Sequence, residues 1–275
     1  SCNIRFCSRL YAATSPGRQP KDSKLKTISE RKTVMKISCA ECNGVAPYIP
    51  GGFKKLGKVA KVKPRWRQAL RNHYRKFFGD VFQVYHEELS KCVHLDFNVF
   101  PANEKRPWHT LVTEGISERQ CFAPNEFADY RRIELMFYLP PHWDFSQLLS
   151  CDEWSWPLRM AQYLGRYVHK RKIFFIPGHS FGPGNEDDCY IYPGSKLNNM
   201  LFAFPADEEE DFNLLYVEGK PVSFIRAIPI TPAEVQYKCD VGIEPLLQLL
   251  DWSDALGPVD TFRDCTLSFN SDSVN

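Results

Sequence analysis

Between residues 85 and 143, apolar and polar side chains alternate in short runs that are typical of β-strands. In the run 93–99 every second residue is apolar, and a period of two places these residues on one face of a strand, against a core. The run 133–139 alternates in the same way until two prolines end it, and a short β-rich run lies between them at 110–113. The pattern predicts three strands, the first of them half-buried, with a polar face formed by His94, Asp96 and Asn98.

Two segments have the periodicity of helices. In 64–79, apolar residues recur at helical spacing, Pro64 suits the first turn, and Gly79 fits the C-terminal end. The arginines of this helix are therefore expected on its solvent side. The segment 154–171 has the same spacing, with a proline near its start. Both segments are predicted to be helices that pack one apolar face against a core.

The clearest local signal is the start of a third helix at Thr231. The Thr231 hydroxyl can cap the backbone N–H of Glu234, the Glu234 carboxylate can bond back to the Thr231 N–H, and Pro232 stands where no N–H partner is needed. We expect Gly242 and Pro245 to end this helix before a second apolar turn formed by Leu246, Leu247, Leu249 and Leu250.

Further strand-like runs follow at 200–204, 213–217 and 222–228, with an acidic run at 207–211 between the first two. Runs of strands clustered between helices, without regular alternation of strand and helix, are typical of α+β proteins. The sequence therefore predicts an α+β fold, with a mixed, largely antiparallel sheet and a few helices packed on it.

The N-terminal part of the chain differs from the rest in composition and in its lack of apolar periodicity. Residues 1–34 are rich in Ser, Thr, Lys and Arg and lack apolar periodicity, so we expect a disordered tail or a non-native extension upstream of Met35; a transit-like targeting segment is the alternative. A basic N-terminal segment at 35–58 would then precede one domain at 59–252. Residues 253–275 would form a C-terminal extension.

Composition limits the class of protein. With 43% hydrophobic and 25% charged residues, the chain of 275 residues resembles an ordinary globular protein. A net charge of +2 argues against a partner that is bound mainly by overall charge, such as nucleic acid. The sequence contains no run of 18 apolar residues, so it predicts no membrane span. The ten cysteines are scattered, with no signal segment before them. We expect them to be mostly reduced, in a cytoplasmic protein.

A local basic stretch departs from this balance. Residues 43–79 contain no acid, and the stretch could face phosphate or an acidic protein. A nucleic-acid binder is therefore one alternative function, and a solvated helix face is the interpretation that we favour. The basic residues are Lys54, Lys55, Lys58, Lys61, Lys63, Arg65, Arg67, Arg71, Arg75 and Lys76.

Four residues could form a metal site, because imidazole and carboxylate groups are what zinc or iron recruits. They are His86, Glu87, His94 and Asp96. The H-E-x-x-H spacing that places two histidines together is absent, so we favour a polar network or partner contact and keep a metal-dependent enzyme as the alternative.

Two other motifs carry less weight. Cys39 and Cys42 form a C-x-x-C pair, but no second pair follows to complete a zinc site. There is no G-x-S-x-G elbow and no phosphate-binding loop. We therefore expect neither an enzyme nor a cofactor.

Several short motifs occur in a recognisable order. They are HE at 86–87, VHLD at 93–96, LVTEGIS at 111–117, RRIELMFYLPPHW at 131–143 and IRAIPITPAEVQY at 225–237. In this order they resemble the Suppressor of fused domain family in its bacterial form, from about residue 66 to residue 250. Ile116 stands where the family more usually has Met, which is a conservative change.

The resemblance implies an α+β domain that acts by binding proteins. The animal member sequesters a transcription factor, and bacterial members are thought to be immunity proteins that neutralise polymorphic toxins. This chain has room for one such domain, without the extra C-terminal lobe of the animal protein, so the resemblance implies a non-enzymatic immunity protein whose partner is a secreted toxin domain. Nuclease toxins are often basic, and complementary charge is expected in the acidic run of Asp207, Glu208, Glu209, Glu210 and Asp211.

Overall fold

The computed structural model describes four stretches of the chain, 63–87, 92–148, 150–182 and 194–270. The expected tail at 1–34 and the basic segment at 35–58, which includes Cys39 and Cys42, lie outside the described residues. So do the four lysines of the basic stretch that precede residue 63.

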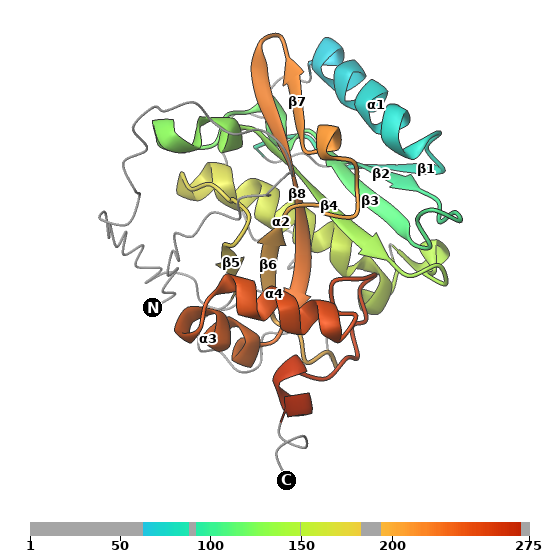
Figure 1. Cartoon of the computed structure of the whole chain (residues 1–275). Helices are drawn as coiled ribbons and strands as arrows, with labels where there is room; N and C mark the ends of the chain where they lie inside the picture. The colour runs from blue at the N-terminus through green and yellow to red at the C-terminus, as the bar shows by residue number, and fades with distance from the viewer. Residues whose placement is uncertain (1–62, 88–91, 149, 183–193, 271–275) are drawn as a thin grey trace, which may run out of the picture.

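The described strands form one sheet of eight strands in the order β1-β2-β3-β4-β8-β6-β5, with β7 paired to β8 off this path (Figure 1). In the described sheet β4 and β8 pair in parallel, and the other pairs are antiparallel. The predicted α+β fold with a mixed, largely antiparallel sheet is confirmed. The strands are β1 (Gln83–His86), β2 (Asp96–Phe100), β3 (His109–Glu114), β4 (Ile133–Leu139), β5 (Ser180–Phe181), β6 (Asn199–Ala203), β7 (Leu214–Val217) and β8 (Lys220–Ile230).

The helices fall close to the segments that periodicity predicted. Gly79 ends the first helix with a φ of 83°, a conformation that glycine adopts without steric cost. The second begins at Asp152 rather than Trp154, and Pro157 lies inside it. The α-helices are α1 (Pro64–Phe78), α2 (Asp152–Arg171), α3 (Pro232–Asp240) and α4 (Ile243–Trp252). Short 3-10 helices are η2 (Ile116–Glu118), η3 (Asn125–Arg131), η4 (Phe145–Gln147), η5 (Glu210–Phe212) and η6 (Thr266–Asn270).

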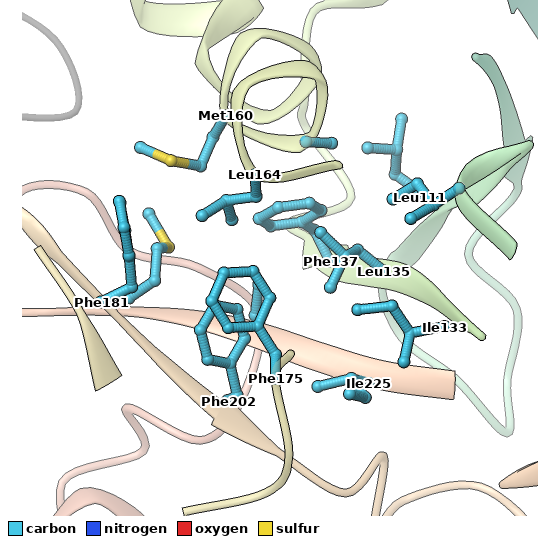
Figure 2. Packing of buried hydrophobic residues seen from close by; sticks show 14 of the residues in the cluster. Leu111, Ile133, Leu135, Phe137, Met160, Leu164, Phe175, Phe181, Phe202 and Ile225 are labelled. Atoms are coloured by element: carbon cyan, nitrogen blue, oxygen red, sulfur yellow. The ribbon is translucent and has the colours of Figure 1, made fainter. Parts of the chain in front are cut away.

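Helices cover the central strands from both sides. On one side, Leu164 of α2 packs with Leu135 and Phe137 of β4 and Phe202 of β6 in the largest apolar cluster (Figure 2). On the other side, α1 packs Trp66, Leu70 and Tyr74 against strands that include β8. The prediction that the first strand is half-buried is wrong, because all five residues of β2 are buried.

The third helix begins as predicted. Thr231 Oγ1 accepts a hydrogen bond from Glu234 N at 3.3 Å, and Thr231 N donates to Glu234 Oε2 at 2.8 Å, which completes the capping box. Gly242, with a φ of 127°, separates α3 from α4. The second apolar turn is therefore a helix that begins directly at Ile243, and Pro245 lies in its first turn.

Residues 253–270 lie against the domain. Val259 N donates to Tyr138 O on β4 at 2.9 Å, and Ser195 Oγ donates to Thr261 O at 3.0 Å. Arg263 Nη1 lies 2.7 Å from Glu234 Oε1 of α3. These contacts connect the C-terminal segment to the sheet and to the capping box.

None of the described helices combines the length and the apolar character that crossing a membrane requires. The cysteines in the described part of the chain are free thiols: Cys92, Cys121, Cys151, Cys239 and Cys265.

Candidate functional site

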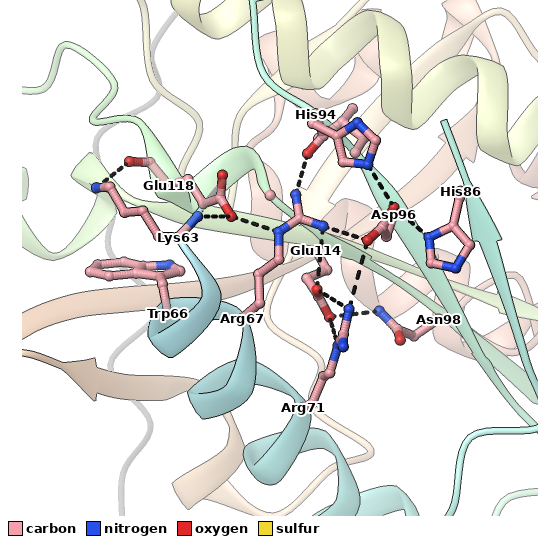
Figure 3. A network of polar contacts seen from close by, with 12 residues as sticks. Lys63, Trp66, Arg67, Arg71, His86, His94, Asp96, Asn98, Glu114 and Glu118 are labelled. Carbon is pink, nitrogen blue, oxygen red and sulfur yellow. Dashed lines mark hydrogen bonds and ion pairs between the residues drawn. The ribbon is translucent and has the colours of Figure 1, made fainter. Parts of the chain in front are cut away.

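The polar face of β2 and β3 carries carboxylates that α1 covers, and Arg67 of α1 reaches them (Figure 3). Its Nε donates to Glu118 Oε1 at 2.6 Å, and its Nη1 lies 3.4 Å from Glu114 Oε1. The same Nη1 bonds to Asp96 Oδ2, and Nη2 donates to His94 O at 2.7 Å. One guanidinium therefore holds three carboxylates and a backbone carbonyl.

This arrangement corrects the expectation that the arginines of α1 face solvent. Arg67 is 5% exposed. The physical reason is that Asp96, Glu114 and Glu118 are also buried, and burying such charges without a cation would be costly. The helix therefore directs one arginine inward, next to its apolar face.

Arg71, one turn further along α1, binds the same cluster at its rim. Its Nε and Nη2 lie 2.9 Å and 2.8 Å from the two oxygens of Glu114, which is a bidentate pair. Asn98 Nδ2 approaches Glu114 Oε2 at 3.4 Å. Arg75 instead pairs with the exposed Asp80 at 3.3 Å. Lys63, just before α1, also joins the cluster, since its Nζ donates to Glu118 O at 2.9 Å. The other exposed cations within α1 are Arg65, Arg75 and Lys76.

The carboxylates around Arg67 and Arg71 raise the pKa of both guanidinium groups. Burial by itself would lower the pKa of Arg67, but the hydrogen bond that it donates to Glu118 and the negative charges of Glu118, Asp96 and Glu114 raise that pKa above its ordinary value. The hydrogen bond with Glu114 likewise raises the pKa of Arg71. Both guanidinium groups are therefore ionised at neutral pH, and their ion pairs help to hold α1 on the sheet.

The four residues of the metal alternative are partly brought together. His86 Nδ1 lies 2.9 Å and His94 Nε2 lies 3.1 Å from the same oxygen, Asp96 Oδ1. Glu87 is directed elsewhere, because its carboxylate accepts from Leu95 N at 3.2 Å and pairs with Arg166 of α2. No group of three or more His, Cys, Asp or Glu side chains that could hold a metal ion occurs in the described ranges. His86, His94 and Asp96 belong instead to the polar network around Arg67.

A second buried carboxylate, Glu134 on β4, holds the turn that carries Glu114 and Glu118. Its Oε1 accepts from Gly115 N at 3.0 Å, from Ser117 N at 3.0 Å and from Ser117 Oγ at 2.6 Å. Its Oε2 accepts from Thr113 Oγ1 at 2.6 Å. Burial raises the pKa of Glu134 to about 7, although these hydrogen bonds act to lower it.

Gly115 is needed in this turn for two reasons. Its φ is 130°, where side chains other than glycine are strained, and a Cβ there would overlap the carbonyl oxygen of His94. The LVTEGIS and RRIELMF motifs thus meet at one point, since the first supplies the donors and the second supplies Glu134.

The acidic run divides into two parts. Asp207 Oδ2 lies 3.1 Å from Arg226 Nη1, and Glu208 Oε1 accepts from Tyr138 Oη at 3.1 Å. Burial is the main cause that raises the pKa of Glu208. The guanidinium of Arg226 also stacks over the Tyr138 ring at 3.9 Å. The part of the run that is exposed and not held by these contacts is Glu209, Glu210 and Asp211.

Sequence reasoning missed Glu134 and the inward role of Arg67. The sequence did contain a signal for Glu134. Because residues two apart share one face of a strand, Glu134 lies on the same face as Met136 and Tyr138, which are large and buried. A charge at such a position predicts a buried hydrogen-bond network. Nothing comparable distinguished Arg67 from Arg71 along the helix.

The family model of the Suppressor of fused protein (SUFU) matches residues 91–264. Among solved structures, a SUFU homolog from Neisseria gonorrhoeae FA 1090 is similar, with a TM-score of 0.50 and 16% identity over 73% of this chain and 96% of that one. The matched chain of the Sufu-Fu complex has a TM-score of 0.54 and 14% identity, over 76% of this chain and 95% of that one. No curated protein matches the chain.

Drosophila Suppressor of Fused is also similar, with a TM-score of 0.54 and 14% identity over 76% of this chain. The match covers 53% of that protein, so this chain corresponds to about half of its length. These low identities show the fold alone. The family match covers well over half of the 275 residues and includes the motifs that meet at Glu134, and the chain therefore belongs to the Suppressor of fused family.

Proposed function

We propose that this chain is a non-enzymatic protein-binding domain that neutralises a toxin by binding it, as an immunity protein. The observation that carries the proposal is where the motif residues of the family lie. Glu134, its donors and the carboxylates around Arg67 are buried, so these motifs specify the scaffold. The motifs therefore supply no exposed constellation of catalytic side chains in the described residues, and in this proposal the function lies on the outer surface, in contacts with a partner.

The similar structures support a binding role, since one of them is a complex of Sufu with Fu. A toxin as the partner follows from the resemblance to bacterial members. In this proposal the chain acts in the cytoplasm of a bacterium, where thiols such as those of the described cysteines stay reduced.

The partner site that we propose is the exposed part of the acidic run, Glu209, Glu210 and Asp211. Asp207 and Glu208 anchor its start to Arg226 and Tyr138, and the buried Phe212 anchors its end beneath α1. Three carboxylates are thus presented at the start of η5, on a segment that is held at both ends. These exposed charges attract a basic protein surface, and the attraction weakens as the salt concentration rises.

The test is affinity capture from the lysate of the host with the tagged chain, followed by mass spectrometry and by co-expression with the captured protein. We expect one stoichiometric, basic partner whose toxicity the chain suppresses. The substitutions Glu209→Gln, Glu210→Gln and Asp211→Asn together should weaken capture and flatten its dependence on salt.

The matched control carries the same change in net charge at exposed acids elsewhere, with Glu104→Gln, Glu126→Gln and Asp251→Asn. It should capture the partner as the wild-type chain does. Unchanged affinity and salt dependence in the loop variant would remove the acidic run from the proposal. A partner whose toxicity persists on co-expression would remove the immunity function.

A further inference from the structure

Within the described residues, the strand β1 is an edge of the sheet. Among the described strands it pairs with β2 alone (Figure 1). Proteins commonly protect such edges by shortening the strand, by covering it, or by placing charges or proline on it. The opposite edge strand, β5, has two residues, and β7 lies beside α1 and is flanked by Glu218 and Lys220. β1 has the sequence QVYH, without Pro, Lys, Arg, Asp or Glu.

The pairing of β1 with β2 shows which backbone groups point away from the sheet. Glu87 N donates to Leu95 O at 3.2 Å, and Tyr85 is the register partner of Phe97. In an antiparallel pair, residues directed toward the partner strand alternate with residues directed away. Tyr85 and Glu87 therefore direct their N–H and C=O groups to β2, and Val84 and His86 direct theirs outward.

Val84 and His86 are two positions apart, so their outward backbone groups can pair with those of a second β1 that is related by a two-fold axis. With the axis at Tyr85, Val84 of each copy lies opposite His86 of the other. Each such pair exchanges two backbone hydrogen bonds, which gives four in all. The facing side chains bring no like charges together, and β-branched and aromatic neighbours are favourable across strands. The edge is thus complementary to itself.

The flank of the strand adds apolar surface. Phe82 is 61% exposed and Val81 is 40% exposed, and the Phe82 ring lies 6.3 Å from that of Phe145 on η4. Large apolar side chains that stay exposed beside an open edge are typical of an interaction surface.

We propose that β1 binds β1 of a second copy of this chain, in the antiparallel register that places Val84 opposite His86, so that two sheets become continuous. This proposal is independent of the toxin-binding proposal, since it concerns another part of the surface. A closed two-fold contact of this kind gives a dimer and does not extend into fibres.

Sedimentation velocity over a range of protein concentrations tests the proposal. We expect the wild-type chain to form a dimer, and Val84→Pro to weaken dimerisation roughly thirtyfold, because it removes the two outward hydrogen bonds donated by Val84 in the two copies. The Val84 N–H does not bond to β2, so folding should be retained, as circular dichroism and thermal unfolding would show. Val84→Thr keeps both the N–H and the β-branched shape, and it should dimerise like wild type.

A second variant tests the register. In the proposed dimer the two Tyr85 residues form a non-hydrogen-bonded pair whose Cα atoms are about 4.5 Å apart, within the range of a disulfide. Tyr85→Cys, treated with oxidised glutathione, should give a covalent dimer, as two thiols are oxidised and glutathione disulfide is reduced. Gln83→Cys, which faces Glu87, should cross-link no more than the wild-type chain.

A wild-type chain that stays monomeric at all concentrations would overturn the proposal. So would a dimer that Val84→Pro leaves unchanged, or equal cross-linking of the two cysteine variants. If Val84→Pro removed binding of a captured partner from an otherwise monomeric chain, the edge would belong to that partner and not to a second copy.

Discussion

The Nε of Arg67 lies 2.6 Å from Oε1 of Glu118, and neither side chain is more than 6% exposed. The contact joins α1 to the turn after β3, which lies 51 residues further along the chain. The same guanidinium also holds Asp96 and Glu114. One side chain therefore supplies most of the buried polar contacts that join α1 to the sheet, beside the apolar contacts of Trp66, Leu70 and Tyr74.

Arg67→Met should lower the free energy of unfolding by about 3 to 5 kcal/mol, because it leaves buried carboxylates without their cation. Urea unfolding followed by tryptophan fluorescence would measure this. The matched control is Arg75→Met, since the Arg75 side chain is 65% exposed in its pair with Asp80; it should cost less than about 1 kcal/mol. Equal effects of the two substitutions would contradict the role of Arg67.

Glu134 should make stability depend on pH near neutrality. Its pKa is about 7 in the folded protein, against an ordinary value of 4.5, so the folded state binds the proton more tightly than the unfolded state does. The resulting stabilisation is fully present below the unfolded pKa, falls as pH rises from about 4.5 to 7, and amounts to about 3 kcal/mol.

Glu134→Gln removes this titration, although it also alters the hydrogen bonds of the turn. The difference between wild-type and variant unfolding free energies should therefore change across pH 4.5 to 7 and be constant above it. Glu104→Gln, at an exposed acid, should follow the wild-type profile. A difference that is constant over the whole range would show that Glu134 does not titrate there.

Gly115→Ala should destabilise the protein by about 3 kcal/mol or more, for two reasons. The added Cβ would overlap the His94 carbonyl oxygen, and the φ of Gly115 is unfavourable for alanine. Gly79 is the matched control. It also has a positive φ, of 83°, but no atom lies within 4 Å of its added Cβ. With a ψ of −151°, Gly79 lies in a backbone region that glycine occupies almost alone, so Gly79→Ala should cost about 1 to 3 kcal/mol and less than Gly115→Ala. Thermal unfolding of both variants would separate steric overlap from backbone strain.

Arg263→Met should release the C-terminal segment from α3. Burial by itself would raise the pKa of Glu234, but the hydrogen bond and charge of Arg263 hold that pKa below its ordinary value. The stabilisation is thus present above the unfolded pKa and is lost as pH falls through the folded one. We expect a loss of about 3 kcal/mol at neutral pH and faster proteolysis after residue 253.

Lys196→Met provides the comparison, because it breaks an ion pair with Asp264 whose side chains are 65% and 61% exposed. It should change stability by less than about 1 kcal/mol. Resistance to proteolysis that is the same in both variants would mean that Arg263 does not hold the segment.

The sequence by itself determined the local elements. The spacing of Trp66, Leu70, Tyr74 and Phe78 predicted α1, and the capping box predicted the start of α3, because both signals act between residues within a few positions of each other. Alternation predicted strands at 93–99 and 133–139, and the order of short motifs identified the family. These features need no knowledge of which segments meet.

The tertiary structure decided what the polar residues do. Alternation shows that Asp96 and Asn98 share a face, but it does not show that α1 covers this face, and that cover turns a half-exposed strand into a buried one. Likewise, Arg67 became an internal cation only because β2, β3 and the turn at 113–118 bring three carboxylates around it. Charge pairs between residues 29 to 51 positions apart are set by packing, and no local pattern records them.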